Sequence, residues 1–161
     1  RSSSSPVQLR IRNVQVAAPF EGKGFVYRTS DLGYQADFYN EFLTAPRSLI
    51  AAQLQAWLSA AKVFRNVLPS GSSVEATHAL EANVSALYGD FRDPASPKAV
   101  LAIEFFLTRE QAASAEMVFH QSYRQEVSIE NRSAEALAKG WGNALGQILA
   151  ELEQELPKLK D

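Results

Sequence analysis

The sequence contains no cysteine. Disulfide bonds, thiolate metal sites, thiol catalysis and thiol redox chemistry are therefore all excluded. The absence assigns no compartment, because a chain without cysteine is compatible with oxidising and with reducing surroundings.

Long apolar runs and clusters of basic residues are missing too. No stretch approaches the ~18–20 apolar residues that span a bilayer. Lysine and arginine together number 16 against 18 acidic residues, which gives a formal net charge of −2. Without a basic patch the chain lacks the phosphate-neutralising surface that nucleic-acid binding requires, so we expect no nucleic-acid partner.

The remaining composition is that of an ordinary folded domain. The chain has 161 residues, of which 46% are hydrophobic and 21% charged, a size and a balance that favour one core over disorder. The polar start, Arg1 to Pro6, is typical of a linker. We predict a flexible serine-rich tether at residues 1–6 and a single domain at residues 7–158.

Alternation of apolar and polar residues predicts strands in the first quarter of the chain. It runs from Val7 to Val16 with a slip of phase at Asn13, which indicates a half-buried strand with a bulge. Two β-rich runs then follow, at residues 25–28 and 34–39. A polar turn from Ser30 to Gly33 separates them, so we expect a hairpin.

Helical spacing appears twice. The first apolar stripe predicts a helix that begins near Pro46 with Thr44 as N-cap and ends near residues 64–66. The second stripe, from Leu137 to Leu156, predicts a final helix capped by Ser133 and ended by Pro157. Its three interior glycines, which are Gly140, Gly142 and Gly146, predict close approach to a packed neighbour.

Three long strands are expected between these helices, at about residues 80–88, 101–107 and 117–127. Their short links favour an antiparallel meander. In the first of them, alternation places Leu80, Ala82, Val84, Ala86 and Tyr88 on one face. The order is β-β-β-α-(β)-β-β-β-α, where the strand in parentheses is optional, so we predict an α/β domain with two main helices.

Groups that could carry catalysis are scarce. His78 and His120 lie outside any Gly-x-Ser-x-Gly context, and we expect both to be surface histidines on strands. The acidic groups Asp90/Asp93 and Asp31/Asp37/Glu41 fall where turns favour aspartate. We therefore predict no enzyme, no catalytic residue, no cofactor and no metal site.

Aromatic residues are dense between Phe20 and Phe42. Core packing alone could explain them, as could core packing combined with a partner surface, because exposed Tyr, Phe and Arg are common in binding hot spots. Phe25 and Tyr27 share one face of a strand, Val26 and Arg28 the other, and we expect only one face to reach the core. The candidate partner-binding residues are Phe25, Tyr27, Arg28, Tyr34, Tyr39 and Asn40.

Several segments together resemble the ABC-type transport auxiliary lipoproteins, the family of paraquat-inducible protein C. The matching features are Phe25-Val26-Tyr27-Arg28, Tyr34, Tyr39-Asn40-Glu41-Phe42, a Pro-started helix with Trp57, Leu87-Tyr88-Gly89-Asp90-Phe91 and a last helix with Trp141. They extend over nearly the whole chain, from about Val7 to Leu156.

The resemblance implies a non-enzymatic periplasmic lipoprotein, anchored by an N-terminal lipid, with the outer membrane as the expected location. Its partners would be a mammalian-cell-entry (MCE) type substrate-binding protein and ABC transporter subunits that move phospholipid or other hydrophobic substrates, and homo-oligomers stay open. The resemblance also implies a three-layer domain with a mixed sheet and helices packed on it, similar to the N-terminal domain of TolB. The lipid-accepting cysteine is absent from this sequence, so the anchor is an inference.

Two other functions would each require a particular arrangement of side chains. A small carrier would enclose a lipid between the sheet and the helices, which requires a contiguous apolar cavity. A hydrolase would require His78 or His120 to meet a serine and an acid.

Overall fold

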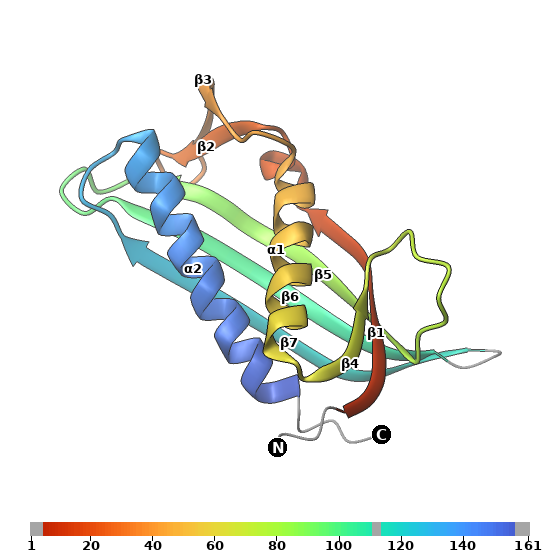
Figure 1. Ribbon diagram of the computed structural model, residues 1–161. Coiled ribbons are helices and arrows are strands. Elements are labelled where there is room, and N and C mark those ends of the chain that lie inside the picture. Colours follow the sequence, from red (N-terminus) through yellow and green to blue (C-terminus); the bar gives the residue numbers. More distant parts are fainter. Residues whose placement is uncertain (1–4, 111–113, 157–161) are drawn as a thin grey trace.

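Seven strands of the described residues form one mixed sheet, with two helices packed on it (Figure 1). The computed structural model describes residues 5–110 and 114–156. The elements follow the predicted order and include the optional strand. They are β1 (Ser5–Val16), the 3-10 segment η1 (Ala18–Phe20), β2 (Gly24–Arg28), β3 (Tyr34–Glu41), α1 (Pro46–Ala61), β4 (Phe64–Leu68), β5 (His78–Asp90), β6 (Lys98–Glu110), β7 (Ala115–Ser128) and α2 (Ala134–Glu155).

Strand β5 lies at the centre of the sheet. Along one edge it pairs with β6, which pairs with β7, both antiparallel, as the predicted meander requires. Its other edge is shared by two parallel strands, because β1 pairs with its first half and β2 with its last residues, Gly89 and Asp90. Strand β4 lies parallel to β1, and β3 lies antiparallel to β2.

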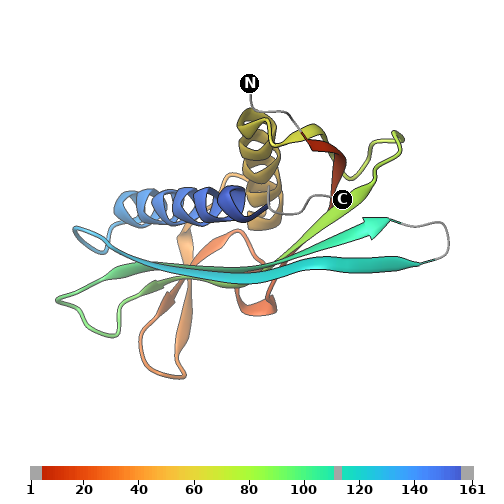
Figure 2. The same ribbon diagram turned by 90° about the horizontal axis from the view of Figure 1, so that it is seen from below.

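Both helices lie on the same face of the sheet (Figure 2). Helix α2 packs on β6 and β7, and α1 packs on β1 and β4. On the opposite side Figure 2 shows η1 and the turn that joins β2 to β3. The arrangement is consistent with the predicted three-layer α/β domain. In the described residues no helix is both long enough and apolar enough to cross a membrane.

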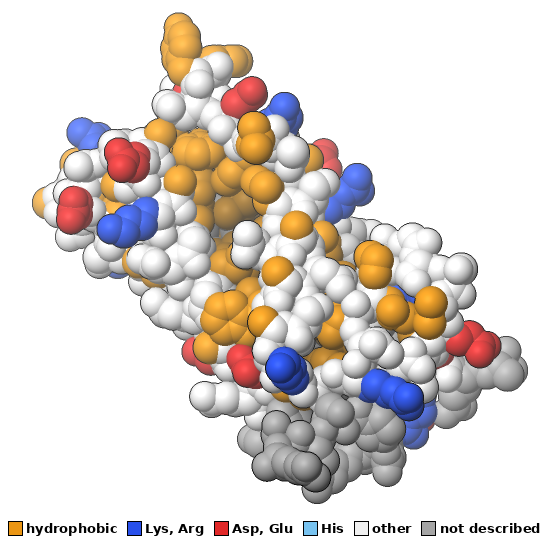
Figure 3. Space-filling model, viewed as in Figure 1, with side chains coloured by type: hydrophobic (Ala, Val, Ile, Leu, Met, Phe, Trp, Pro, Cys, Tyr) orange, Lys and Arg blue, Asp and Glu red, His pale blue; other side chains and the backbone are white. Residues whose placement is uncertain are grey.

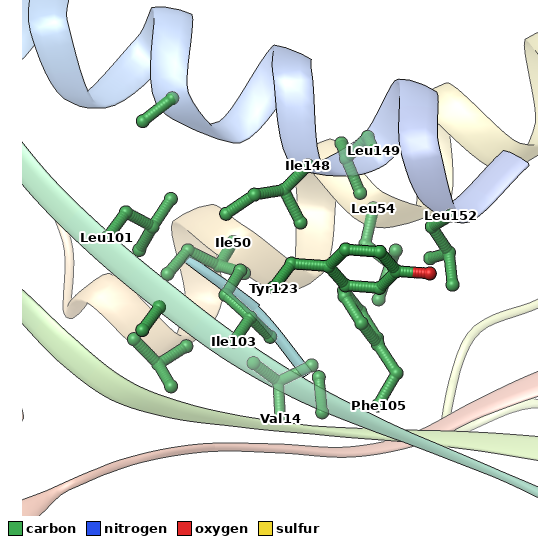
Figure 4. Close-up of a cluster of buried hydrophobic side chains, with 14 of the residues drawn as sticks. Val14, Ile50, Leu54, Leu101, Ile103, Phe105, Tyr123, Ile148, Leu149 and Leu152 are labelled. Atoms are coloured by element: carbon green, nitrogen blue, oxygen red, sulfur yellow. The ribbon is translucent and has the colours of Figure 1, made fainter. Parts of the chain in front are cut away.

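Packed side chains fill the space between the helices and the sheet (Figure 4). Leu101, Ile103 and Phe105 of β6 meet side chains from both helices, and almost none of their surface remains exposed. The helix side chains labelled in this cluster are Ile50 and Leu54 of α1 and Ile148, Leu149 and Leu152 of α2. The stripe predicted for the last helix is thus the side that faces the sheet.

Three predicted boundaries were wrong. Helix α1 has Ala45, not Thr44, at its N-cap, and Pro46 opens the helix as expected. The helix ends at Ala61 because Lys62 adopts the left-handed conformation with φ 56°, so β4 can begin at Phe64. Strand β1 already starts at Ser5, inside the predicted tether. The cap of α2 is confirmed, since the Ala136 N–H donates to the Ser133 hydroxyl at 3.1 Å, whereas Pro157 lies outside the described residues.

Two bulges change the faces of the strands. The predicted slip in β1 is confirmed by a register shift between Ile11 and Asn13. A second bulge, in β5 between Val84 and Ala86, was not predicted. It moves Ala86 and Tyr88 to the face opposite the helices, so the expectation that they share a face with Leu80 was wrong.

The interior glycines of α2 differ from one another. A Cβ atom on Gly140 would lie 2.7 Å from side-chain atoms of Ala99 and Ile129, as the predicted close approach requires. At Gly142 and Gly146 nothing lies within 4 Å of such an atom, so for these two the prediction was wrong.

Candidate functional site

The β2–β3 hairpin is fixed to α2 through an aromatic cluster. Phe25 is 6% exposed, and its ring lies 4.6 Å from the Phe42 ring and 5.0 Å from the Trp141 ring, between centroids. Phe25 is therefore a core residue. Its assignment as a residue that contacts a partner is corrected, because neighbouring rings already cover its surface.

The opposite face of β2 is covered too. Val26 is buried, and Arg28 donates to the Tyr88 hydroxyl at 3.3 Å and to the Asp31 carbonyl oxygen at 2.9 Å. The Arg28 guanidinium also lies 5.7 Å from the centroid of the Tyr34 ring. The expectation that only one face of this strand reaches the core was wrong, because the bulge in β5 turns Tyr88 toward Arg28.

Asp37 organises the middle of β3. Its carboxylate accepts the Tyr27 hydroxyl, the main-chain N–H groups of Tyr39 and Asn40 at 2.8 and 3.0 Å, and the Asn40 side-chain amide at 2.9 Å. The Tyr27 ring itself stacks on Phe91 at 5.0 Å. One carboxylate thus holds both its own strand and the neighbouring β2.

These bonds build a wide bulge in β3. Gly24 is opposite Glu41 and Val26 is opposite Ala36, so residues 37–40 together face a single position of β2. We call residues 37–40 the aromatic bulge. Gly24 permits the close approach, since a Cβ atom there would lie 2.8 Å from the Asp37 carbonyl oxygen.

The aromatic bulge directs two large side chains into solvent. Phe38 is 95% exposed and Tyr39 is 94% exposed, with Leu43 nearby in sequence and also exposed. At the end of the molecule that carries β3, hydrophobic side chains project beyond the surrounding surface (Figure 3). Exposed aromatic side chains on a hydrogen-bonded support are the usual material of a binding site.

The hydrogen bonds of the aromatic bulge also shift the pKa values of its acidic groups. Donation by the Tyr27 hydroxyl and by Asn40 holds the pKa of Asp37 well below its usual range. Burial, followed by the bond to Asp37 and the charge of Asp37, raises the pKa of Tyr27 well above its ordinary value. At neutral pH the pair is therefore a neutral phenol that donates to a carboxylate.

Apart from Phe25 and Tyr27, the predicted site residues divide into two groups. Arg28 and Tyr34 lie together beside the turn, where they also contact Tyr88. Tyr39 and Asn40 lie in the aromatic bulge, at the other end of the hairpin.

Phe38 and Leu43 were missed, because the alternation of a regular strand does not show that residues 37–40 bulge out of the sheet. Two residues could have indicated the bulge. They are Gly24 in the paired strand and Asp37, which lies three positions before Asn40.

The two histidines differ in exposure and in their polar neighbours. His78 is buried at 7% exposure, which corrects the expected surface position, and its Nδ1 atom lies 2.9 Å from the Thr77 hydroxyl. His120 is exposed as expected. Its Nε2 atom lies 2.9 Å from Glu104, which also accepts the Ser122 hydroxyl at 3.4 Å. A triad needs the imidazole between serine and acid, whereas here the acid lies between the other two.

The described residues contain no group of three acidic or histidine side chains that could hold a metal ion.

The match to a known protein family covers almost the whole chain. Residues 1–153 match the model of a family described as the ABC-type transport auxiliary lipoprotein component. The chain belongs to this family. No curated protein sequence matches it. Membership of the auxiliary lipoprotein family confirms the resemblance seen in the sequence, and the family name associates its members with ABC transporters.

Solved structures support the fold of the auxiliary lipoprotein. Protein XCC0632 from Xanthomonas campestris aligns with a TM-score of 0.81 at 13% identity, over 95% of this chain and 86% of that one. An uncharacterised protein aligns with a TM-score of 0.77 at 18% identity, over 96% of this chain and 94% of that one. A chain of the PelC dodecamer from Paraburkholderia phytofirmans aligns with a TM-score of 0.53 at 14% identity, over 92% of this chain and 94% of that one. At these identities the likeness shows the fold alone.

Proposed function

We propose that this auxiliary lipoprotein is a non-enzymatic periplasmic accessory subunit of an ABC/MCE-type transporter that moves phospholipid or other hydrophobic substrates. The observation that carries the proposal is the aromatic bulge, in which Asp37 and Gly24 hold Phe38 and Tyr39 almost fully exposed. Two exposed rings gain apolar contact only when a partner covers them. In this proposal the partner is the MCE-type protein or another subunit of the transporter.

The position of the bulge in the molecule fits an anchored subunit. Strand β1 begins at the end of the molecule opposite the hairpin (Figure 1). An N-terminal lipid would hold the start of β1 near its membrane and direct Phe38 and Tyr39 away from that membrane. The rings would then meet a transporter subunit, and the anchoring bilayer would lie at the far end.

Co-purification tests the proposal. We expect the double variant Phe38→Ala/Tyr39→Ala to lose most of the transporter subunits recovered with a tagged chain. Met117→Ala serves as the control, because Met117 is 57% exposed on β7, outside the hairpin. Thermal unfolding should stay the same in both variants. Full recovery of the partners with the double variant would reject the docking site.

Tyr27 and Arg28 are less suitable for this test. Tyr27 holds Asp37, and Arg28 holds the turn through the Asp31 carbonyl oxygen. Substituting either residue would disturb the support of the exposed rings, so weaker docking would not show direct contact.

The alternative function, a small lipid carrier, requires an enclosed apolar space between the sheet and the helices. In the described part of the chain that space is occupied by fully buried side chains such as Phe105, Leu54 and Ile148. The structure therefore favours docking. A lipid that stays bound in native mass spectrometry would favour the carrier instead.

A further inference from the structure

Strand β1 continues beyond the strand beside it. β4 accompanies β1 only as far as Arg10, which is opposite Leu68. Pro69 follows Leu68, and because proline has no N–H to donate it ends the strand. β1 runs on to Val16, where its other edge is still paired with β5. Along residues 11–16 no described strand pairs with the β4-side edge, so its main-chain N–H and C=O groups are open to another chain.

This free edge opens into a groove. The groove has a volume of about 480 Å³ and lies between residues 11–15 of β1, the first half of α1 and the loop residues Pro69 and Ser70. Small side chains of α1, among them Ser48, Ala51 and Ala52, line its helix side. Ligand clefts typically measure ~300–1,000 Å³. A further strand placed about 4.8 Å from β1 would continue the sheet where β4 stops.

The charge of the groove has one sign. Arg12 and Arg47 line it, and its lining includes no aspartate or glutamate. Arg12 is paired with Glu110 at 2.6 Å. Arg47 is exposed in the first turn of α1 and forms no ion pair with the described residues. The groove is therefore complementary to an acidic ligand.

We propose that the free edge of β1 binds an extended acidic segment of a protein partner as an added strand. Main-chain hydrogen bonds to residues 11–16 would hold the segment, and a carboxylate in it would pair with Arg47. A free strand edge selects a polypeptide over a lipid, because it offers N–H and C=O groups in strand register. The positive lining selects acidic side chains. This groove and the aromatic bulge are separate surfaces, so the binding proposal for one can be refuted while the proposal for the other stands.

A peptide pair tests the inference directly. The probe is a short fluorescent peptide of alternating valine and glutamate, and the control carries lysine in place of glutamate. Added to the purified chain, the glutamate peptide should bind at least about tenfold more tightly by fluorescence polarisation, because the groove is positive. It should also slow amide hydrogen exchange within residues 11–16, which binding by charge alone would leave unchanged. Absence of binding, or binding without protection of these amides, overturns the proposal.

Matched variants locate the binding site. Arg47→Glu reverses the free charge and Ala52→Phe fills the groove, so each should weaken binding of the glutamate peptide by about tenfold or more. Arg65→Glu and Ala60→Phe change exposed positions of β4 and α1 outside the groove lining, and should change the affinity by no more than about twofold. Equal effects of the two sets would refute the site.

Sedimentation of the chain alone tests the other possible occupant of the groove, which is a second copy of the chain. Self-association that Ala52→Phe abolishes would show that a second copy fills the groove, which also refutes a partner segment. Loss of transporter subunits in the Phe38→Ala/Tyr39→Ala variant bears only on the aromatic bulge and leaves the β1 groove unaffected.

Discussion

At the scale of single residues, Asp37 connects the two strands of the hairpin. Its carboxylate replaces the cross-strand partners that residues 39 and 40 would have in a regular ladder, and it ties β3 to Tyr27 of β2. An interrupted edge strand is normally weak, but four donors on one carboxylate stabilise this one.

The raised pKa of Tyr27 gives a testable pH dependence. A pKa that is higher in the folded chain than in the unfolded one adds stability below the ordinary tyrosine value of about 10, and that stability is lost as the pH rises through the raised value. We expect the phenolate absorbance of the folded chain to show tyrosines that ionise late. Tyr27→Phe should remove one of them and leave Tyr123, whose pKa burial and Glu155 also raise. If Tyr27→Phe removes a tyrosine of ordinary pKa, the bond to Asp37 is not as described.

Two glycines of α2 form a matched pair for a stability measurement. Gly140→Ala would press a methyl group against Ala99 and Ile129 at 2.7 Å, and such overpacking costs about 1–3 kcal/mol. Gly142→Ala meets nothing within 4 Å and should stabilise the helix by up to about 1 kcal/mol. Urea unfolding of the two variants should therefore move the midpoint in opposite directions. Stabilisation by both would mean that α2 can shift away from β6.

At the scale of elements, the hairpin has one end in the core and another in solvent. Phe25 packs against Phe42 and Trp141, whereas Phe38 of the aromatic bulge is 95% exposed. The same hairpin therefore contains residues that stabilise the fold and residues that are free to bind, although both kinds are aromatic.

Single alanine variants separate the two kinds of residue. Phe25→Ala should lower the free energy of unfolding by about 3–5 kcal/mol, the usual cost of removing a buried phenylalanine. Phe38→Ala should change it by less than about 0.5 kcal/mol, because the side chain is exposed. Chemical denaturation measures both. A large loss of stability with Phe38→Ala would mean that this side chain packs against the fold and is not free to bind.

At the scale of the whole molecule, the strand order explains why there are two candidate surfaces. β1 and β2 both pair with the same edge of β5. The outer strands beside them, β4 and β3, differ in length. β3 continues the sheet on one side and carries the aromatic bulge. β4 stops short of β1 on the other side and leaves the groove. Both surfaces are thus unfinished edges of one sheet, where a partner can add contacts that the chain does not make for itself.

The sequence by itself determined the order and type of the elements. Period-two and helical spacing report local geometry, so the hairpin, the meander, the bulge in β1 and the cap at Ser133 were predictable from residues close together in the chain. The family resemblance rested on the same local segments and was confirmed. The absence of cysteine excluded thiol chemistry on composition alone.

Only the tertiary structure decided which side chains of those elements are covered. Phe25 is buried because α2, far away in the sequence, places Trp141 against it, and Phe38 is exposed because Asp37 interrupts the alternation. His78 is buried on a central strand, where it lies between Leu9 of β1 and Arg109 of β6. The free edge of β1 likewise follows from where Pro69 stops a neighbouring strand. Periodicity shows that a strand has two faces, and what lies against each face is set by residues that the pattern does not include.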